Sequence, residues 1–228
     1  MHPPLPFNAR AARALREKLG MAPGHVAYGM RASFGTSHVG PEHVIAWERG
    51  THVPDAAEFT ALAGALWCQP SELMGHPRTL LEHRIARGVS AEDVARATGL
   101  TLDAYLAMEE SGQWAGDKRQ SVHLGEVLSL PPRDFIAITR LEDELARLLT
   151  EAVSTRWQAH IRDIAKLVSM ERRDLKGPLS AMHQEYQGLM AATLSRAGGT
   201  TASGEDGRRF IENIVDQFWT RLPGSSRP

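Results

Sequence analysis

Few side chains in this sequence are arranged for catalysis or metal binding. The single cysteine, Cys68, has no adjacent base and lies in an apolar stretch, so we expect a buried thiol rather than a nucleophile. His38, His43 and His52 match no spacing of metal ligands. The chain contains no HExxH, GxSxG or phosphate-binding glycine loop, and adjacent carboxylates such as Glu109-Glu110 are typical of solvated helix faces. We therefore expect neither an enzyme nor a metal or cofactor site.

The composition is that of a globular protein without a membrane-spanning segment. Of 228 residues, 42% are hydrophobic and 23% charged, and no apolar run approaches the ~20 residues that cross a bilayer. The N-terminus lacks the basic start and apolar core of a secretory signal, which predicts a cytoplasmic protein. The net charge is −1, but residues 1–50 carry six basic and three acidic residues, while residues 80–138 carry six and nine. A phosphate-binding surface is therefore expected in the N-terminal region.

Helical periodicity dominates, and one pattern of elements occurs twice. Residues 12–75 (the first copy) and 81–138 (the second copy) each read as a basic amphipathic helix, a short helix, a turn, another helix and two more short helices. In the second copy Ser90 and Thr101 stand at helix N-cap positions, and Gly99 makes the turn between two helices. The repeat predicts two similar helical domains.

Three local features carry a family resemblance. The stretch Gly88-Val89-Ser90-Ala91-Glu92-Asp93-Val94-Ala95 is followed by Gly99-Leu100-Thr101. The ending Trp47-Glu48-Arg49-Gly50 is echoed weakly by Met108-Glu109-Glu110-Ser111-Gly112, and Pro54 precedes an apolar helix. Together these features resemble the lambda-repressor-like, XRE-type helix-turn-helix domains over more than half of the chain. The resemblance implies an all-α fold with two tandem lambda-repressor-like helix-turn-helix domains, 9–76 and 78–138, followed by a C-terminal helical bundle, 139–222.

The first copy departs from this family before its recognition helix. From Met30 to Gly40 it has roughly seven residues more than the family's short turn requires. Either the preceding helix is extended, or the turn carries a protruding loop.

The resemblance implies that the helix from Pro41 enters the major groove of DNA. There Glu42 could accept a hydrogen bond from a cytosine amino group, and His43 could address a base or a phosphate. Trp47 is expected in the core, and Glu48 in a hydrogen bond within the domain. The full set of residues implied to contact DNA is Arg31, Ser33, Thr36, Ser37, His38, Pro41, Glu42, His43, Ile45, Ala46, Arg49 and Thr51.

The equivalent face of the second copy has less suitable chemistry. Asp103 and the aliphatic Leu106 and Ala107 are poor partners for a polyanion, which favours a degenerate copy used for packing or dimerisation. The alternative is a separate phosphate patch made by the basic residues Arg84, Arg87, Arg96, Lys118 and Arg119.

The C-terminal third is read as amphipathic helices, interrupted at Gly177-Pro178. Its aromatic residues, among them Trp157 and Tyr186, favour a packed core over a ligand pocket. Regulators of the resembled family commonly attach such a region for dimerisation or for sensing, so an unidentified small-molecule or protein effector is expected here.

The sequence thus indicates a sequence-specific DNA-binding transcriptional regulator. We expect its partners to be double-stranded DNA and a second copy of the chain, with a homodimer on a palindromic operator whose half-sites lie about 34 Å apart. No membrane partner is expected. The alternative is a protein-interaction module that keeps the helix-turn-helix fold without DNA binding, which the scarcity of Lys and Arg on both recognition helices favours.

Overall fold

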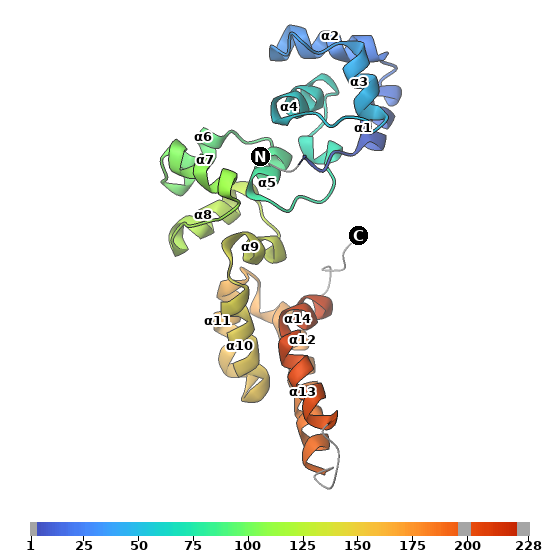
Figure 1. The fold of residues 1–228 in the computed structure, drawn as a ribbon. Coiled ribbons are helices and arrows are strands. Elements are labelled where there is room, and N and C mark those ends of the chain that lie inside the picture. Colours follow the sequence, from blue (N-terminus) through green and yellow to red (C-terminus); the bar gives the residue numbers. More distant parts are fainter. Residues whose placement is uncertain (1–3, 196–201, 223–228) are drawn as a thin grey trace. The chain divides into compact units, whose positions relative to one another are not determined.

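A computed structural model describes residues 4–195 and 202–222 of the chain, and these residues are helical almost throughout (Figure 1). The all-α prediction is confirmed for them; their β pairing is limited to an isolated bridge between Phe7 and Met74. Within the same residues, no helix combines the length and the apolar composition that crossing a bilayer requires.

The chain divides into two compact units, Met1–Leu130 and Pro131–Pro228, which are described separately. The first unit contains α1 (Ala9–Lys18), α2 (Pro23–Phe34), α3 (Pro41–Glu48), α4 (Ala56–Ala65), the short 3₁₀ helix η1 (Pro70–Leu73), α5 (Leu80–Arg87), α6 (Ala91–Thr98), α7 (Leu102–Ser111) and α8 (Lys118–Leu128). The second unit contains α9 (Pro132–Thr139), α10 (Glu142–Ser154), α11 (Trp157–Leu167), α12 (Arg172–Ser195), α13 (Ala202–Glu212) and α14 (Ile214–Arg221). Helix α9, which the repeat pattern assigns to the second copy, thus belongs to the C-terminal unit.

The first copy is built around α2, which packs on both α3 and α4. Met30 of α2, Trp47 of α3 and Phe59 of α4 belong to one buried cluster, as predicted for Trp47. Helix α4 begins at a reciprocal cap, in which the Asp55 carboxylate accepts from the backbone N–H of Glu58 at 2.8 Å and the Glu58 carboxylate accepts from the N–H of Asp55 at 2.9 Å. The packing of α2 on α3 and the burial of Trp47 attach α3 to the first copy.

The second copy shows the caps that its sequence predicts. The Ser90 hydroxyl accepts from the N–H of Asp93 at 3.1 Å, and the Thr101 hydroxyl accepts from the N–H of Ala104 at 3.3 Å. Gly99 ends α6 with φ +72°, a left-handed conformation that glycine adopts without steric cost. These local signals account for where α6 ends and where α7 begins.

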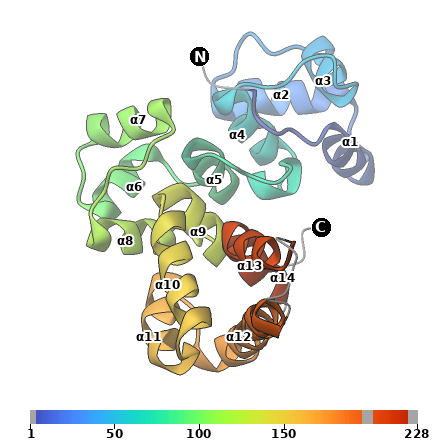
Figure 2. The ribbon, with the colours of Figure 1, turned by 60° about the horizontal axis from the view of Figure 1, so that its bottom comes forward.

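The C-terminal unit packs α10, α11 and α12 against one another, with α13 and α14 along α12 (Figure 2). The interruption predicted at Gly177-Pro178 is wrong, because α12 runs through both residues. An internal proline removes one helical hydrogen bond and costs about 3 kcal/mol. Leu175, Leu179 and Met182 on either side are fully buried, and burying each such side chain contributes about 1.5–3 kcal/mol, which offsets that cost.

Candidate nucleic-acid interface

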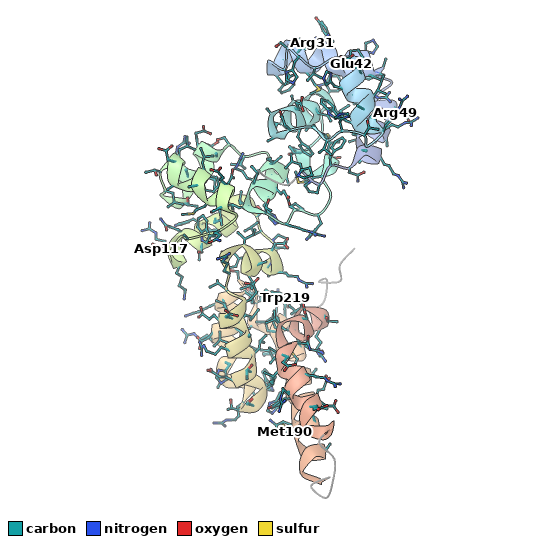
Figure 3. The ribbon with its side chains drawn as sticks, viewed as in Figure 1. Arg31, Glu42, Arg49, Asp117, Met190 and Trp219 are labelled. Carbon is teal, nitrogen blue, oxygen red and sulfur yellow. The ribbon has the colours of Figure 1, made fainter. Side chains whose placement is uncertain are left out.

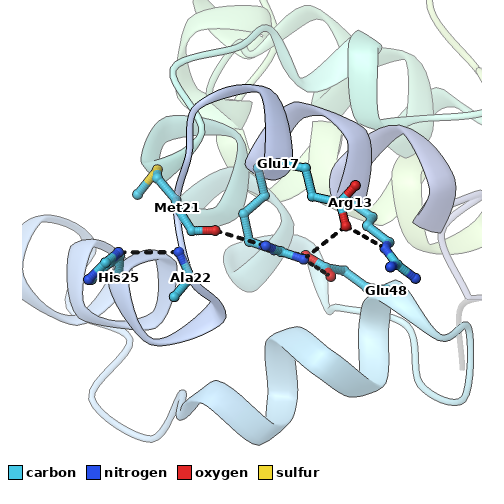
Figure 4. Close-up of polar contacts among 7 residues, drawn as sticks. Arg13, Glu17, Met21, Ala22, His25 and Glu48 are labelled. Carbon is cyan, nitrogen blue, oxygen red and sulfur yellow. Dashed lines mark hydrogen bonds and ion pairs between the residues drawn. The ribbon is translucent and has the colours of Figure 1, made fainter.

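An arginine of α1 holds the end of α3 in place. The Arg16 guanidinium donates two parallel hydrogen bonds to the Glu48 carboxylate, from Nε at 2.6 Å and from Nη2 at 2.7 Å. Its Nη1 donates to the carbonyl of Met21 at 2.8 Å (Figure 4). Hydrogen bonding to Glu48 raises the pKa of Arg16, and both side chains are only about a tenth exposed, at 11% and 9%. Glu48 is therefore a structural residue, as predicted.

The same arrangement recurs in the second copy, where Glu109 is only 5% exposed, so the solvated position expected for this carboxylate is wrong. Arg84 of α5 donates from Nε at 2.6 Å and from Nη2 at 3.0 Å to the carboxylate of Glu109 in α7, and its Nη1 donates to the carbonyl of Val89 at 3.2 Å. Burial raises the pKa of the neighbouring Tyr105 hydroxyl far above its usual range, so this tyrosine stays neutral. We call each pair, Arg16–Glu48 and Arg84–Glu109, an Arg–Glu clamp.

The two clamps give matching positions by which the sequences of the two copies can be aligned, and this alignment shows where the extra residues of the first copy lie. Arginine and glutamate are 32 residues apart in the first clamp and 25 in the second, a difference of seven. Helix α2 has 12 residues where α6 has 8, and the connection 35–40 has three residues more than the connection 99–101. Both alternatives left open by the sequence therefore contribute, a longer helix and a longer turn.

The long turn, residues 35–40, is held by contacts within the domain. Nη1 of Arg31 donates to the carbonyl of Val39 at 2.6 Å, and Val39 is fully buried. Nε2 of His38 lies 2.9 Å from the Glu58 carboxylate. Thr36 is only 7% exposed, so its side chain is inaccessible to DNA and we remove it from the proposed contacts. Arg31 and His38 are exposed but already have partners in the protein.

The predicted recognition helix, α3, exposes the side chains near its N-terminus. Pro41, Glu42 and Ile45 are exposed, and Ala46 is half-buried. Nδ1 of His43 accepts a hydrogen bond from the N–H of Gly40 at 3.0 Å, so the neutral ring carries its proton on Nε2. The His43 side chain is 40% exposed. Its Nδ1 also lies 3.3 Å from Oε1 of Glu42, and in the tautomer that accepts from Gly40 the Nε2–H is a donor at the start of this helix.

The remaining predicted contacts surround this helix. Figure 3 shows Arg31 on α2, Glu42 at the start of α3 and Arg49 at its other end. Arg49 is exposed and forms no ion pair with the residues the structure describes, whereas the hydroxyl of Thr51 donates to the carbonyl of Ala46 at 3.0 Å. Ser33 and Ser37 are also exposed. Apart from Thr36, the predicted set thus lies on accessible surface.

The second copy presents different chemistry at the matching positions. With Glu48 matched to Glu109, Glu42 corresponds to Asp103, His43 to Ala104 and Arg49 to Glu110. The alternative basic patch is also reduced, because Arg84 is bound to Glu109, while Nη1 of Arg96 contacts Asp93 at 2.8 Å. Arg87, Lys118 and Arg119 remain exposed.

The sequence analysis missed the two clamp arginines. Arg16 and Arg84 each precede by five residues the residue whose carbonyl they bind, Met21 and Val89, and that shared position is the signal that could have revealed them. Among the described residues there is no group of three or more histidine, cysteine or acidic side chains that could hold a metal ion. Comparisons of the chain with protein-family models, with curated proteins and with solved structures gave no match.

Proposed function

We propose that this chain is a sequence-specific DNA-binding regulator of the lambda-repressor-like, XRE-type helix-turn-helix class, and that α3 is its recognition helix. The observation that carries the proposal is the Arg16–Glu48 clamp together with the exposed start of α3. A recognition helix must be rigidly attached to its domain while the side chains at its N-terminus stay free to reach base edges. Buried Trp47 and the clamp provide the attachment, and Glu42, His43 and Ile45 are the accessible side chains.

Each exposed group has chemistry that suits a particular partner on DNA. The Nε2–H of His43 suits the N7 or O6 acceptor of guanine, and the Glu42 carboxylate suits the amino group of cytosine. Ile45 can contact a thymine methyl group. Arg49, which has no carboxylate partner among the described residues, suits a phosphate at the end of α3. The second copy replaces the histidine and arginine by Ala104 and Glu110, so we propose that only the first copy reads DNA.

The weak charge of the chain favours action as a dimer. Residues 1–50 have an excess of only three basic residues, and few phosphate contacts give weak binding at physiological salt. Two copies of α3 on a palindromic operator, about 34 Å apart, would double those contacts. We therefore propose a cytoplasmic homodimer, with the C-terminal unit contributing to dimerisation or to effector sensing.

A mobility-shift assay with the region upstream of the protein's own gene tests this function. We expect a sequence-dependent shift that His43→Ala weakens severalfold and Arg49→Ala weakens at least fivefold, since a neutral hydrogen bond contributes about 0.5–1.5 kcal/mol and one to a charged group about 1.5–3 kcal/mol. Asp103→Ala, at the position matched to Glu42, is the control and should leave the shift unchanged. Absence of any shift, or binding without sequence preference, would favour a protein-interaction module that keeps the fold without reading DNA.

A further inference from the structure

The C-terminal unit contains an open cavity lined mainly by basic side chains. It has a volume of about 270 Å³ and lies between the end of α11, the connection 168–171 and the start of α12. The lining residues are Arg162, Ala165, Lys166, Met170, Glu171 and Arg172. Three cations and one carboxylate therefore surround it.

The local fold brings the backbones of these three cationic residues close together. Arg162 and Lys166 are one helical turn apart on α11 and lie on the same face, with the small, buried Ala165 between them. The connection to α12 is tight, because the N–H of Met170 donates to the carbonyl of Ala165 at 3.0 Å. Arg172 is the first residue of α12, where the helix dipole also favours negative charge. The cations thus extend from ordered helices.

The three cations have no carboxylate partner within ion-pair distance among the described residues, and Glu171 pairs with none of them. Five other arginines of the same unit find partners, in the pairs Arg133–Asp216, Arg147–Glu151, Arg173–Asp174, Arg209–Glu205 and Arg221–Glu185, whereas Arg140, Arg156 and Arg208 have no carboxylate partner in the part of the chain that the structure describes and lie outside this cavity. Like charges gathered around one cavity repel each other, and a bound anion would remove that repulsion. Binding of an anion at this cavity would therefore be electrostatically favourable.

We propose that this cavity binds a small anion carrying two or more negative charges on phosphate or carboxylate groups. Arg162 and Arg172 can each donate two parallel hydrogen bonds to such a group, and Lys166 adds a point charge. Sites for drug-sized ligands have volumes of about 300–1,000 Å³, so a cavity of about 270 Å³ suits a smaller molecule. The site would operate whether or not α3 reads DNA.

Calorimetric titration of the full-length protein tests the site, with inorganic pyrophosphate and citrate as separate probes at constant ionic strength. We expect saturable binding of at least one probe, and the tighter one identifies the phosphate or the carboxylate class. Arg162→Gln and Arg172→Gln should each weaken it at least tenfold. Glu171→Gln should tighten it severalfold, because it removes a negative charge from the lining. Arg208→Gln, an exposed arginine outside the cavity, is the control and should change affinity less than twofold.

Three results would overturn the proposal. The first is the absence of saturable binding of either probe. The second is an equal loss of affinity in Arg208→Gln, which would mean that only general charge attracts anions. The third comes from a competition experiment with duplex DNA. If DNA displaces the probe, and if Arg162→Gln and Arg172→Gln weaken DNA binding as much as probe binding, these cations are DNA contacts rather than a small-anion site.

Discussion

Arg16 and Glu48, 32 residues apart in the sequence, meet through two hydrogen bonds of 2.6 and 2.7 Å that join the first helix to the end of the third. Arg84 and Glu109 repeat this contact in the second copy at a separation of 25 residues. The clamp is therefore common to both copies, whereas the exposed side chains beside it differ. If only one copy keeps a binding role, we expect both copies to share the clamp but to differ in the exposed side chains beside it.

Removal of one clamp residue should destabilise the first unit. Glu48→Ala leaves the largely buried Arg16 guanidinium without its carboxylate, and breaking such a pair costs about 3–5 kcal/mol when fully buried. We expect a loss of about 2–4 kcal/mol in the free energy of unfolding, measured by urea denaturation with circular dichroism. Arg13→Ala is the control, because the Arg13–Glu17 pair is more than half exposed and such pairs contribute about 0–1 kcal/mol. A change below 0.5 kcal/mol for Glu48→Ala would refute the structural role of the clamp.

Gly35 should be required at the start of the long turn. It follows α2 with φ +70°, and a β-carbon there would meet no atom within 4 Å, so the only cost of a side chain is backbone strain. We expect Gly35→Ala to lower the free energy of unfolding by about 1 kcal/mol. Gly188→Ala, inside α12 with similar open space, should instead raise it by about 0.5–1 kcal/mol. Effects of the same sign in both variants would contradict the left-handed conformation at Gly35.

Cys68 should react slowly with alkylating reagents. Burial raises the pKa of this half-buried thiol from 9.0 to about 11, and the thiolate is the reactive form. At pH 8 the folded protein should then hold about one hundredth of the thiolate of the unfolded chain. Because the pKa of Cys68 is higher in the folded protein, its thiol contributes to the free energy of unfolding fully below pH 9. This contribution is lost as the pH rises through 11.

Mass spectrometry after iodoacetamide treatment measures this reactivity. We expect alkylation at pH 8 to be at least tenfold slower in the native protein than in urea, with the difference closing toward pH 11. Equal rates at pH 8 would show that Cys68 is accessible and unperturbed.

Arg49 should contribute to affinity but little to sequence preference. A phosphate contact weakens binding to all sequences alike when it is removed, and it reduces the slope of log K against log salt by about 1. We expect both effects for Arg49→Ala in fluorescence-anisotropy titrations at salt concentrations from about 50 to about 200 mM, a range over which the screening of charges changes. Glu110→Ala, the matched position in the second copy, should leave the slope unchanged. An unchanged slope in Arg49→Ala would exclude its phosphate contact.

The sequence predicted the features that depend on neighbouring residues. The caps at Ser90 and Thr101 and the turn at Gly99 are local, so their residue types alone indicate them. The Arg16–Glu48 clamp and the contact of Arg31 with Val39 depend on how helices pack, which periodicity does not describe. The burial of Thr36 also depends on how the long turn packs, so the sequence alone did not predict it.

The continuation of α12 through Pro178 has a similar cause. The local effect of proline favours a break, but the buried side chains on either side belong to tertiary packing. The number of extra residues before α3, seven, could be counted from the sequence. How they divide between the helix and the turn could not be predicted, because α2 ends at Gly35 and the turn is anchored by the buried Val39.

Selection of DNA by the full-length protein from a randomised duplex library tests the central claim most directly. We expect enrichment of one palindromic motif, with half-sites one helical turn or a multiple of it apart, and a changed base preference within each half-site for His43→Ala. Ala104→His, at the matched position of the second copy, should select the same motif as the unmodified protein. Failure to enrich any common sequence, under conditions in which a known helix-turn-helix repressor enriches its operator, would contradict sequence reading by α3.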